Sequence, residues 1–237
     1  IYLTGSSSKN VSRDISTTLR GRAIHYEVFP LSFGEYLDFK GIEMKHYSTE
    51  TEARMLHALD EYLQWGGFPE VVMEKDKPLK LKILQEYADL ILYKDLIEQY
   101  GIKNQYLLKY LLKHFMTNPS SLASVNKLYN DLKSQGVSLS KSSLYEYIEY
   151  LLDAYILFST SKYSPSLRVQ TQNPSKYYIV DTGLTLVFTP NRGRDLGKKL
   201  ENAIYLHLRT QPDIHDIFYY KNRFEVDFFY GEADRHY

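Results

Sequence analysis

The chain has 237 residues, 43% of them apolar and 24% charged, and its 29 basic and 29 acidic residues give a formal net charge of zero. This balance argues against a protein that coats nucleic acid, although it leaves room for a local basic patch. The absence of cysteine excludes disulfides, thiolate nucleophiles and cysteine-ligated zinc, and it is compatible with the cytoplasm, where we expect the protein. No run of about 18 apolar residues occurs, so we expect no membrane span.

Residues 1–48 read as the end of an α/β sheet domain. IYLTGSSS at the start predicts a short buried strand, residues 10–22 a short amphipathic helix, and residues 23–31 a second strand. Ser32, followed by Glu35, predicts a capping box at the start of the next helix. Two strands cannot form such a sheet alone, so we expect another part of the sheet before residue 1.

Residues 49–103 have a helical period that Gly-Gly-Phe-Pro interrupts, and they predict a helical region. Lys80, Lys82 and Lys94 lie among carboxylates, and we expect all three on a solvated face.

Residues 104–190 predict three helices and then two β-rich stretches, which is the order of a winged helix-turn-helix. The third helix of that fold reads DNA, and Lys141, Ser142 and Ser143 are its candidate DNA contacts here. These residues supply few phosphate contacts. The alternative is a winged helix that binds a protein or another domain.

Residues 191–237 predict an amphipathic helix and a hairpin that turns near Asn222. A hairpin at the end of a chain lacks the strand pairing that it needs, so we expect this unit also to be truncated. Glu225 and Asp227 share one face of their strand, and Glu201 lies on the preceding helix. Three such carboxylates are candidate Mg²⁺ ligands that could activate water against a phosphodiester, and the alternative is the solvent face of an edge strand.

Several motifs of other enzyme classes are missing from the sequence. It contains neither a GxxxxGK[ST] phosphate loop nor a Gly-x-Ser-x-Gly elbow, and its 7 histidines are scattered without metal-ligand spacing.

Motifs along almost the whole chain point to one family. In order, they are LTGSSS, LRGRAIHYEVFPLSFGEYL, WGGFPEVV, NPSSLASVNKLYNDLKSQG, LYEYIEYLLDAYILF, YYIVDTGL, LGKKLENAIYLHLR and YYKNRFEVDFF. With them the chain resembles bacterial and archaeal P-loop ATPases of the AAA superfamily that carry a C-terminal domain of unknown function numbered 4143.

The resemblance implies a multidomain fold of α/β and α+β classes. Its parts would be the end of a P-loop ATPase sheet over 1–48, a helical lid over 49–103, a winged helix over 104–190, and a truncated nuclease-like domain of the PD-(D/E)xK type over 191–237.

The resemblance also implies ATP and Mg²⁺ in the intact protein. Ser6 or Ser7 would sense the γ-phosphate. Arg22, and after it Arg20, would be the arginine finger that reaches the nucleotide of a neighbouring subunit, which implies a homo-oligomer. The alternative for Arg22 is a surface arginine that favours the negative end of a helix dipole.

In the nuclease-like part, Glu201 and Asp227 match the family acids and Glu225 is adjacent, but the family's further strand, often with a lysine, is absent from the 237 residues. We therefore expect the C-terminal portion of an AAA-type ATPase that acts on DNA and is inactive by itself, with neither cofactor bound by this chain alone. The alternatives are a non-catalytic winged-helix module for DNA or protein, and the remnant of a metal-dependent nuclease.

Overall fold

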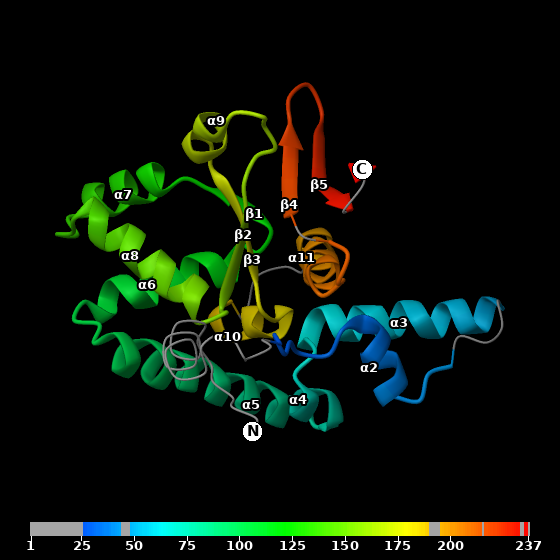
Figure 1. The fold of residues 1–237 in the computed structure, drawn as a ribbon. Helices are drawn as coiled ribbons and strands as arrows, with labels where there is room; N and C mark the ends of the chain where they lie inside the picture. The colour runs from blue at the N-terminus through cyan, green and yellow to red at the C-terminus, as the bar shows by residue number, and fades with distance from the viewer. Residues whose placement is uncertain (1–25, 44–47, 190–194, 215, 233–234, 237) are drawn as a thin grey trace, which may run out of the picture.

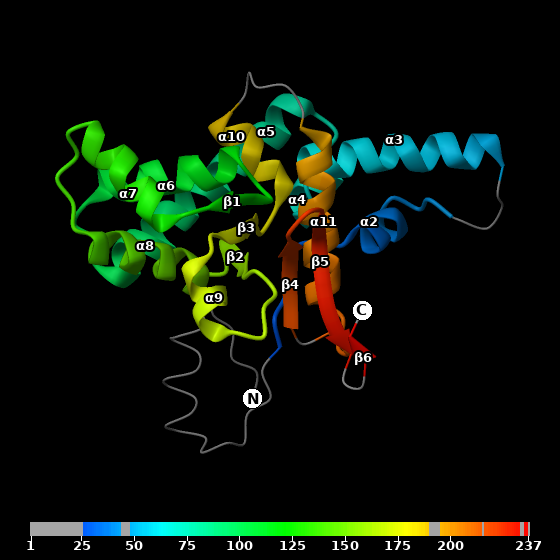
Figure 2. The ribbon, with the colours of Figure 1, turned by 90° about the horizontal axis from the view of Figure 1, so that it is seen from above.

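The computed structural model of the chain describes residues 26–43, 48–189, 195–214, 216–232 and 235–236. Within these ranges the protein is a mixed α/β molecule, mostly helical, with two small antiparallel sheets. Figures 1 and 2 show most helices on one side of the first sheet, the second sheet beside α11 (Leu196–Arg209), and α3 (Thr49–Trp65) extending away from the rest. None of the described helices combines the length and the apolar composition that a membrane crossing requires.

The first described helix, α2 (Phe33–Phe39), begins with the capping box that the sequence predicts. The Ser32 hydroxyl accepts a hydrogen bond from the Glu35 N–H, and the Glu35 carboxylate accepts one from the Ser32 N–H at 2.8 Å. The strand expected over residues 23–31 is wrong for its described part, because residues 26–31 form no strand. The backbone there pairs with a turn instead: the Leu31 N–H donates to the Gly67 carbonyl at 2.8 Å.

The helical period over residues 49–103 is confirmed, with a break at the predicted glycines. The helices are α3, α4 (Pro69–Met73), α5 (Lys77–Leu90) and the π-helix η1 (Ile91–Glu98). Lys82 and Lys94 are exposed as expected. The expectation for Lys80 is wrong, because its side chain is buried and its ammonium lies 5.4 Å from the centre of the Trp65 ring. The long apolar stem of a lysine packs well on such a ring, and the cation gains from the ring's negative face.

The middle of the chain forms the first sheet and the helices that cover it. The three predicted helices are confirmed, and a short strand that the sequence reasoning missed lies between the first two. The order along the chain is α6 (Gln105–Thr117), β1 (Ser121–Ala123), α7 (Val125–Ser134), α8 (Lys141–Asp153), β2 (Leu157–Thr160), α9 (Leu167–Gln172) and β3 (Ser175–Ile179). The strands pair in the order β1-β3-β2, so β3 is central. Leucines on one face of α6, α7 and α8 bury the core against this sheet, whereas α9 has no buried residue.

A turn after β3 joins three distant segments at what we call the Asp181 junction, formed by Leu31, Gly66, Gly67, Asp181 and Gly183. The Asp181 carboxylate accepts hydrogen bonds of 2.7 Å from the N–H groups of Gly67 and Gly183. Gly66 has a φ of +82°, and a Cβ on it would lie 1.7 Å from an Asp181 oxygen, so only glycine fits. The turn continues into η2 (Thr182–Leu184) and α10 (Thr185–Phe188).

The last unit contains helix α11 and the predicted hairpin, and a third short strand that the sequence did not predict extends the hairpin to a second sheet. Its strands are β4 (Asp216–Lys221), β5 (Glu225–Glu232) and β6 (Arg235–His236), paired in chain order. Asn202 on α11 holds the helix to β3: its amide donates to the Ile179 carbonyl and accepts from the Ile179 N–H, both at 2.8 Å. These two hydrogen bonds therefore fix the position of the middle of α11 along β3.

Candidate functional site: an acidic cluster around Lys176

Three carboxylates from two elements meet a lysine from a third. The Lys176 ammonium on β3 lies 2.6 Å from Glu201 Oε1 on α11, 2.7 Å from Asp227 Oδ1 on β5 and 3.8 Å from Glu225 Oε1 on the same strand. Lys221 on β4 pairs with the other oxygen of Glu225 at 2.7 Å. We call Glu201, Glu225 and Asp227 the acidic cluster.

Local structure explains how these side chains converge. Residues two apart on a strand point to the same side, so Glu225 and Asp227 face one way, as the sequence predicts. Lys176 and Tyr178 share a face of β3 for the same reason. The clamp between Asn202 and β3 brings the neighbouring Glu201 to that face.

Burial differs sharply across the cluster. The Lys176 side chain is 4% exposed and that of Glu201 is 16% exposed, whereas Asp227 is 51% exposed. Burial alone would lower the pKa of Lys176, but hydrogen bonds to Asp227 and Glu201, with their negative charges, outweigh it and the pKa is raised. Lys176 is therefore charged throughout the physiological range. Burial raises the pKa of Glu201, and the bonded Lys176 opposes that rise.

Aromatic rings form the inner wall of the site. The Tyr178 hydroxyl donates to Glu201 Oε1 at 3.2 Å, and its ring stacks on Tyr205 with centroids 4.0 Å apart and planes 4° from parallel. Burial, and after it the charge of Glu201, raises the pKa of Tyr178, so this hydroxyl stays protonated and remains a donor. Glu201 thus has two donors fixed by β3.

The cluster as arranged does not fit a divalent cation. The positively charged ammonium lies within hydrogen-bond distance of two of the three carboxylates, where a metal would need their oxygens. Among the described residues, no group of three or more His, Cys, Asp or Glu side chains is disposed to hold a metal ion. The Mg²⁺ site at Glu201, Glu225 and Asp227 therefore stays a prediction, and we derive no chemical step through it.

The remaining predicted site residues divide into two groups. Ser6, Ser7, Arg20 and Arg22 lie outside the described residues. The DNA-binding candidates lie at the start of α8, where Lys141 and Ser142 are exposed and Ser143 is half-buried.

The start of α8 is a polar cap with little positive charge. The Ser140 hydroxyl caps the helix through the Ser143 N–H at 3.0 Å and also bonds the Ser142 hydroxyl at 2.8 Å. Further along α8, Glu146 is exposed on the helix surface, which reduces the attraction of the helix for phosphates.

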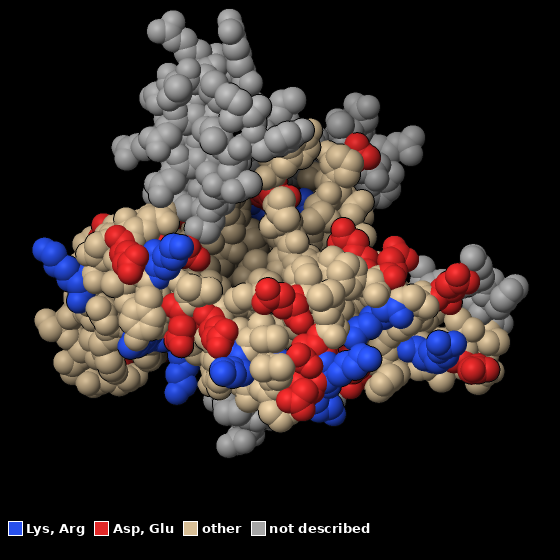
Figure 3. Space-filling model, turned by 90° about the horizontal axis from the view of Figure 1, so that it is seen from below, with Lys and Arg blue, Asp and Glu red and all other residues tan. Residues whose placement is uncertain are grey.

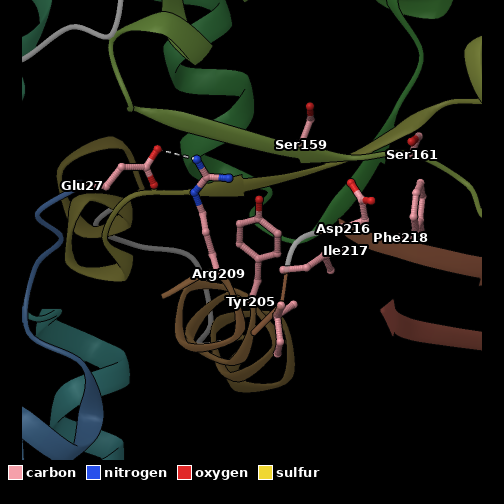
Figure 4. Close-up of a pocket in the computed structure, with 9 residues that line it drawn as sticks. Glu27, Ser159, Ser161, Tyr205, Arg209, Asp216, Ile217 and Phe218 are labelled. Atoms are coloured by element: carbon pink, nitrogen blue, oxygen red, sulfur yellow. Dashed lines mark hydrogen bonds and ion pairs between the residues drawn. The ribbon is translucent and has the colours of Figure 1, made fainter. Parts of the chain in front are cut away.

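The sequence reasoning missed a polar cavity of about 400 Å³ beside α11 (Figure 4). Arg209 lines this cavity and donates a hydrogen bond to Glu27 Oε1 at 2.7 Å. The Arg209 guanidinium lies 4.8 Å from the centre of the Phe158 ring. Because Glu27 already pairs with Arg209, the cavity does not offer an unpaired arginine to an anionic ligand.

The fold and the site together define a mixed α/β protein that carries a lysine-centred acidic cluster at the contact between two small sheets. More specifically, the chain belongs to the family described as "Domain of unknown function (DUF8612)", whose model matches residues 56–195. Residues 1–37 match the model of another family, described as "AAA domain". The resemblance to the domain numbered 4143 stays a prediction.

Two curated relatives, both named only as uncharacterized proteins, are similar over nearly the whole chain. The one from Methanocaldococcus jannaschii is 38% identical over 239 residues, covering 98% of this chain and 53% of the relative. The one from Haemophilus influenzae is 30% identical over 235 residues, covering 99% of this chain and 56% of the relative. The chain thus spans about half the length of these relatives. No solved structure matches it significantly.

Proposed function

We propose that this chain is part of an AAA-type ATPase whose phosphate-binding loop lies outside these 237 residues. The observation that carries the proposal is the match of residues 1–37 to the AAA domain family. The length of the two relatives, about twice the matched region, leaves room for a nucleotide-binding segment in proteins of this kind.

The described contacts support mechanical coupling between the AAA-matched segment and the DUF8612 region. Leu31, near the end of the AAA match, donates to Gly67, and its own carbonyl accepts a 2.9 Å hydrogen bond from the Tyr62 hydroxyl. Tyr36 and Leu37 are buried against α3. A displacement of α2 on nucleotide turnover would therefore move α3 and the Asp181 junction with it.

In this proposal the chain contributes residues to a nucleotide site and does not form that site alone. Bound ATP with Mg²⁺ would supply the phosphoryl chemistry. Ser6 or Ser7 would contact the terminal phosphate, and Arg22 or Arg20 would stabilise its developing charge from a neighbouring copy.

The test is ATP hydrolysis by the full-length protein that contains this chain. Replacing Arg22 by alanine should lower kcat by about 10³-fold or more, as for other arginine fingers, with little change in ATP affinity. Arg20→Ala is measured alongside it, and Arg54→Ala on the exposed surface of α3 is the matched control. A full-length protein that neither binds nor hydrolyses ATP would refute the proposal. Full activity in both Arg22 and Arg20 variants would refute only the arginine finger.

A second candidate function is DNA binding by residues 104–190. The element order helix, strand, helix, helix, strand, strand supports a winged helix once the short helix α9, which lies between the last two strands, is taken as an insertion, and α8 would then enter the groove. Figure 3 shows basic and acidic residues interspersed over one face of the described part, which does not favour a broad phosphate-binding surface.

The DNA proposal is tested by the salt dependence of duplex binding. Lys141→Ala should weaken binding and lower the slope of log K against log salt by about 0.9, the value for one lost phosphate contact. Lys127→Ala on the exposed side of α7 is the matched control. Binding that is equal in both variants would exclude α8 as the contact and favour a protein partner.

A further inference from the structure

We propose that Lys176 is the resident cation of the acidic cluster, and that its ammonium excludes divalent cations for as long as β3 stays packed against α11 and β5. The cluster in this state is an internal lock between the two small sheets. It becomes a metal-accessible group of carboxylates only when those sheets separate. This inference rests on the described residues and is independent of the ATPase proposal.

The first argument is that the Lys176 ammonium already contacts every carboxylate of the cluster. A lysine ammonium carries three donors. The Lys176 Nζ lies 2.6 Å from Glu201 Oε1 and 2.7 Å from Asp227 Oδ1, so two donors are used by these carboxylates. Glu225 Oε1, 3.8 Å from the same nitrogen, completes the ring of carboxylates. Lys176 thus contacts all three members of the acidic cluster.

The second argument is position. Lys176 and Glu201 form the buried inner part of the cluster, whereas Glu225 and Asp227 are 38% and 51% exposed at its outer side. A cation arriving from solvent would reach the outer carboxylates first and would meet the ammonium before Glu201. It could then use only part of the oxygen set, beside a like charge.

The third argument is charge. The three carboxylates face two ammonium groups, because Lys221 binds the outer oxygen of Glu225. The cluster is therefore left with a formal charge of −1, too little to favour a divalent ion that must shed water and approach Lys176. Removing the Lys176 charge leaves a net −2 and frees the inner oxygens, which is the condition that a hard cation prefers.

The fourth argument is rigidity. The Lys176 side chain is confined, since it is only 4% exposed and the part of β3 that follows it is held in place. Tyr178 stacks on Tyr205 of α11, and Ile179 is clamped by Asn202. Separation of β3 from α11 breaks these contacts and the contact of Lys176 with Glu201 at once, so the lock and the packing of the two units form one cooperative element.

The experiment titrates Mn²⁺ into the 237-residue chain and measures bound metal by electron paramagnetic resonance. Lys176→Met keeps the length of the side chain and removes its charge. The variant should bind Mn²⁺ at least about tenfold more tightly than the wild type, and Glu201→Gln added to it should abolish the gain. Lys198→Met, which removes a half-exposed lysine from the same helix as Glu201, should behave like the wild type.

Two outcomes would overturn the proposal. One is a folded Lys176→Met variant, checked by circular dichroism, that binds Mn²⁺ no better than the wild type. The other is wild-type binding of Mn²⁺ that Glu201→Gln weakens.

Because the methionine variant risks unfolding, a measurement on the wild type decides the question independently. With ¹⁵N-labelled lysine, the Lys176 Nζ resonance should keep its width as Mn²⁺ is added. Paramagnetic broadening of that resonance ahead of those of surface lysines would place the metal at the cluster and refute the lock.

Discussion

Replacing Asp181 by asparagine removes a titrating carboxyl group from the centre of the junction. The side chain is 2% exposed, and burial raises its pKa from 3.8 to about 7, although hydrogen bonds from Gly67 and Gly183 act to lower it. The folded protein therefore holds this proton more tightly than the unfolded chain does. The resulting stability is fully present below a pH of about 3.8 and is lost as the pH rises through about 7.

The size of the effect follows from these two pKa values. Between about pH 5 and pH 8, the wild-type free energy of unfolding should fall by about 2 to 3 kcal/mol from this group alone. The asparagine variant should lack that dependence. Its amide offers one oxygen to the two N–H donors, so one donor loses its acceptor and the variant should be less stable by about 1 to 3 kcal/mol at the acid end. The two proteins should therefore approach equal stability at the alkaline end.

The assay is urea denaturation followed by far-ultraviolet circular dichroism across this pH range. Asp213→Asn, at an exposed position after α11, is the control and should keep the wild-type slope. Parallel pH profiles for the wild type and Asp181→Asn would refute the reasoning, because they would mean that Asp181 does not take up a proton on folding.

Two further substitutions test the packing described above. Gly66→Ala should destabilise the protein by more than about 3 kcal/mol, because its Cβ would collide with Asp181. Gly101→Ala, at a φ of +61° in open space, is the control and should cost about 1 to 2 kcal/mol. Equal shifts in thermal midpoint for the two variants would contradict the close approach of Gly66 to Asp181. Asn202→Ala leaves the buried N–H and carbonyl of Ile179 unpaired and should cost about 2 to 4 kcal/mol in urea denaturation. A loss below about 1 kcal/mol would show that water replaces the amide.

Local signals in the sequence predicted most of the helices. The capping box at Ser32 involves residues three apart, and the Gly-Gly-Phe-Pro break is a property of its own residues, so neither depends on distant parts of the chain. The expected strand over residues 23–31 is wrong in its described part for the converse reason. Its apolar pattern resembles that of a strand, but Leu31 pairs with the turn at Gly67.

The acidic cluster was predictable only in part. Strand alternation correctly placed Glu225 and Asp227 on one face, because that is a geometric property of a single strand. Lys176 was missed, since nothing in the sequence indicates that β3 packs on α11 and supplies a cation to Glu201. Lys80 was misassigned for a related reason: carboxylates nearby in sequence suggested solvent, whereas Trp65, distant in sequence, covers its side chain. The winged-helix and nuclease-like assignments stay predictions.

Trp65 also gives the protein an optical probe. It is the sole tryptophan among 237 residues, it is buried, and it directly precedes Gly66 at the junction. A buried indole emits at shorter wavelength than one in water, and it can be excited where the 23 tyrosines do not absorb. Fluorescence from the unlabelled protein therefore reports on a single location, the meeting point of the AAA-matched segment, α3 and the turn after β3. Within this chain, a movement of α2 against α3 would change that one signal, and stopped-flow mixing would time the movement without any engineered dye.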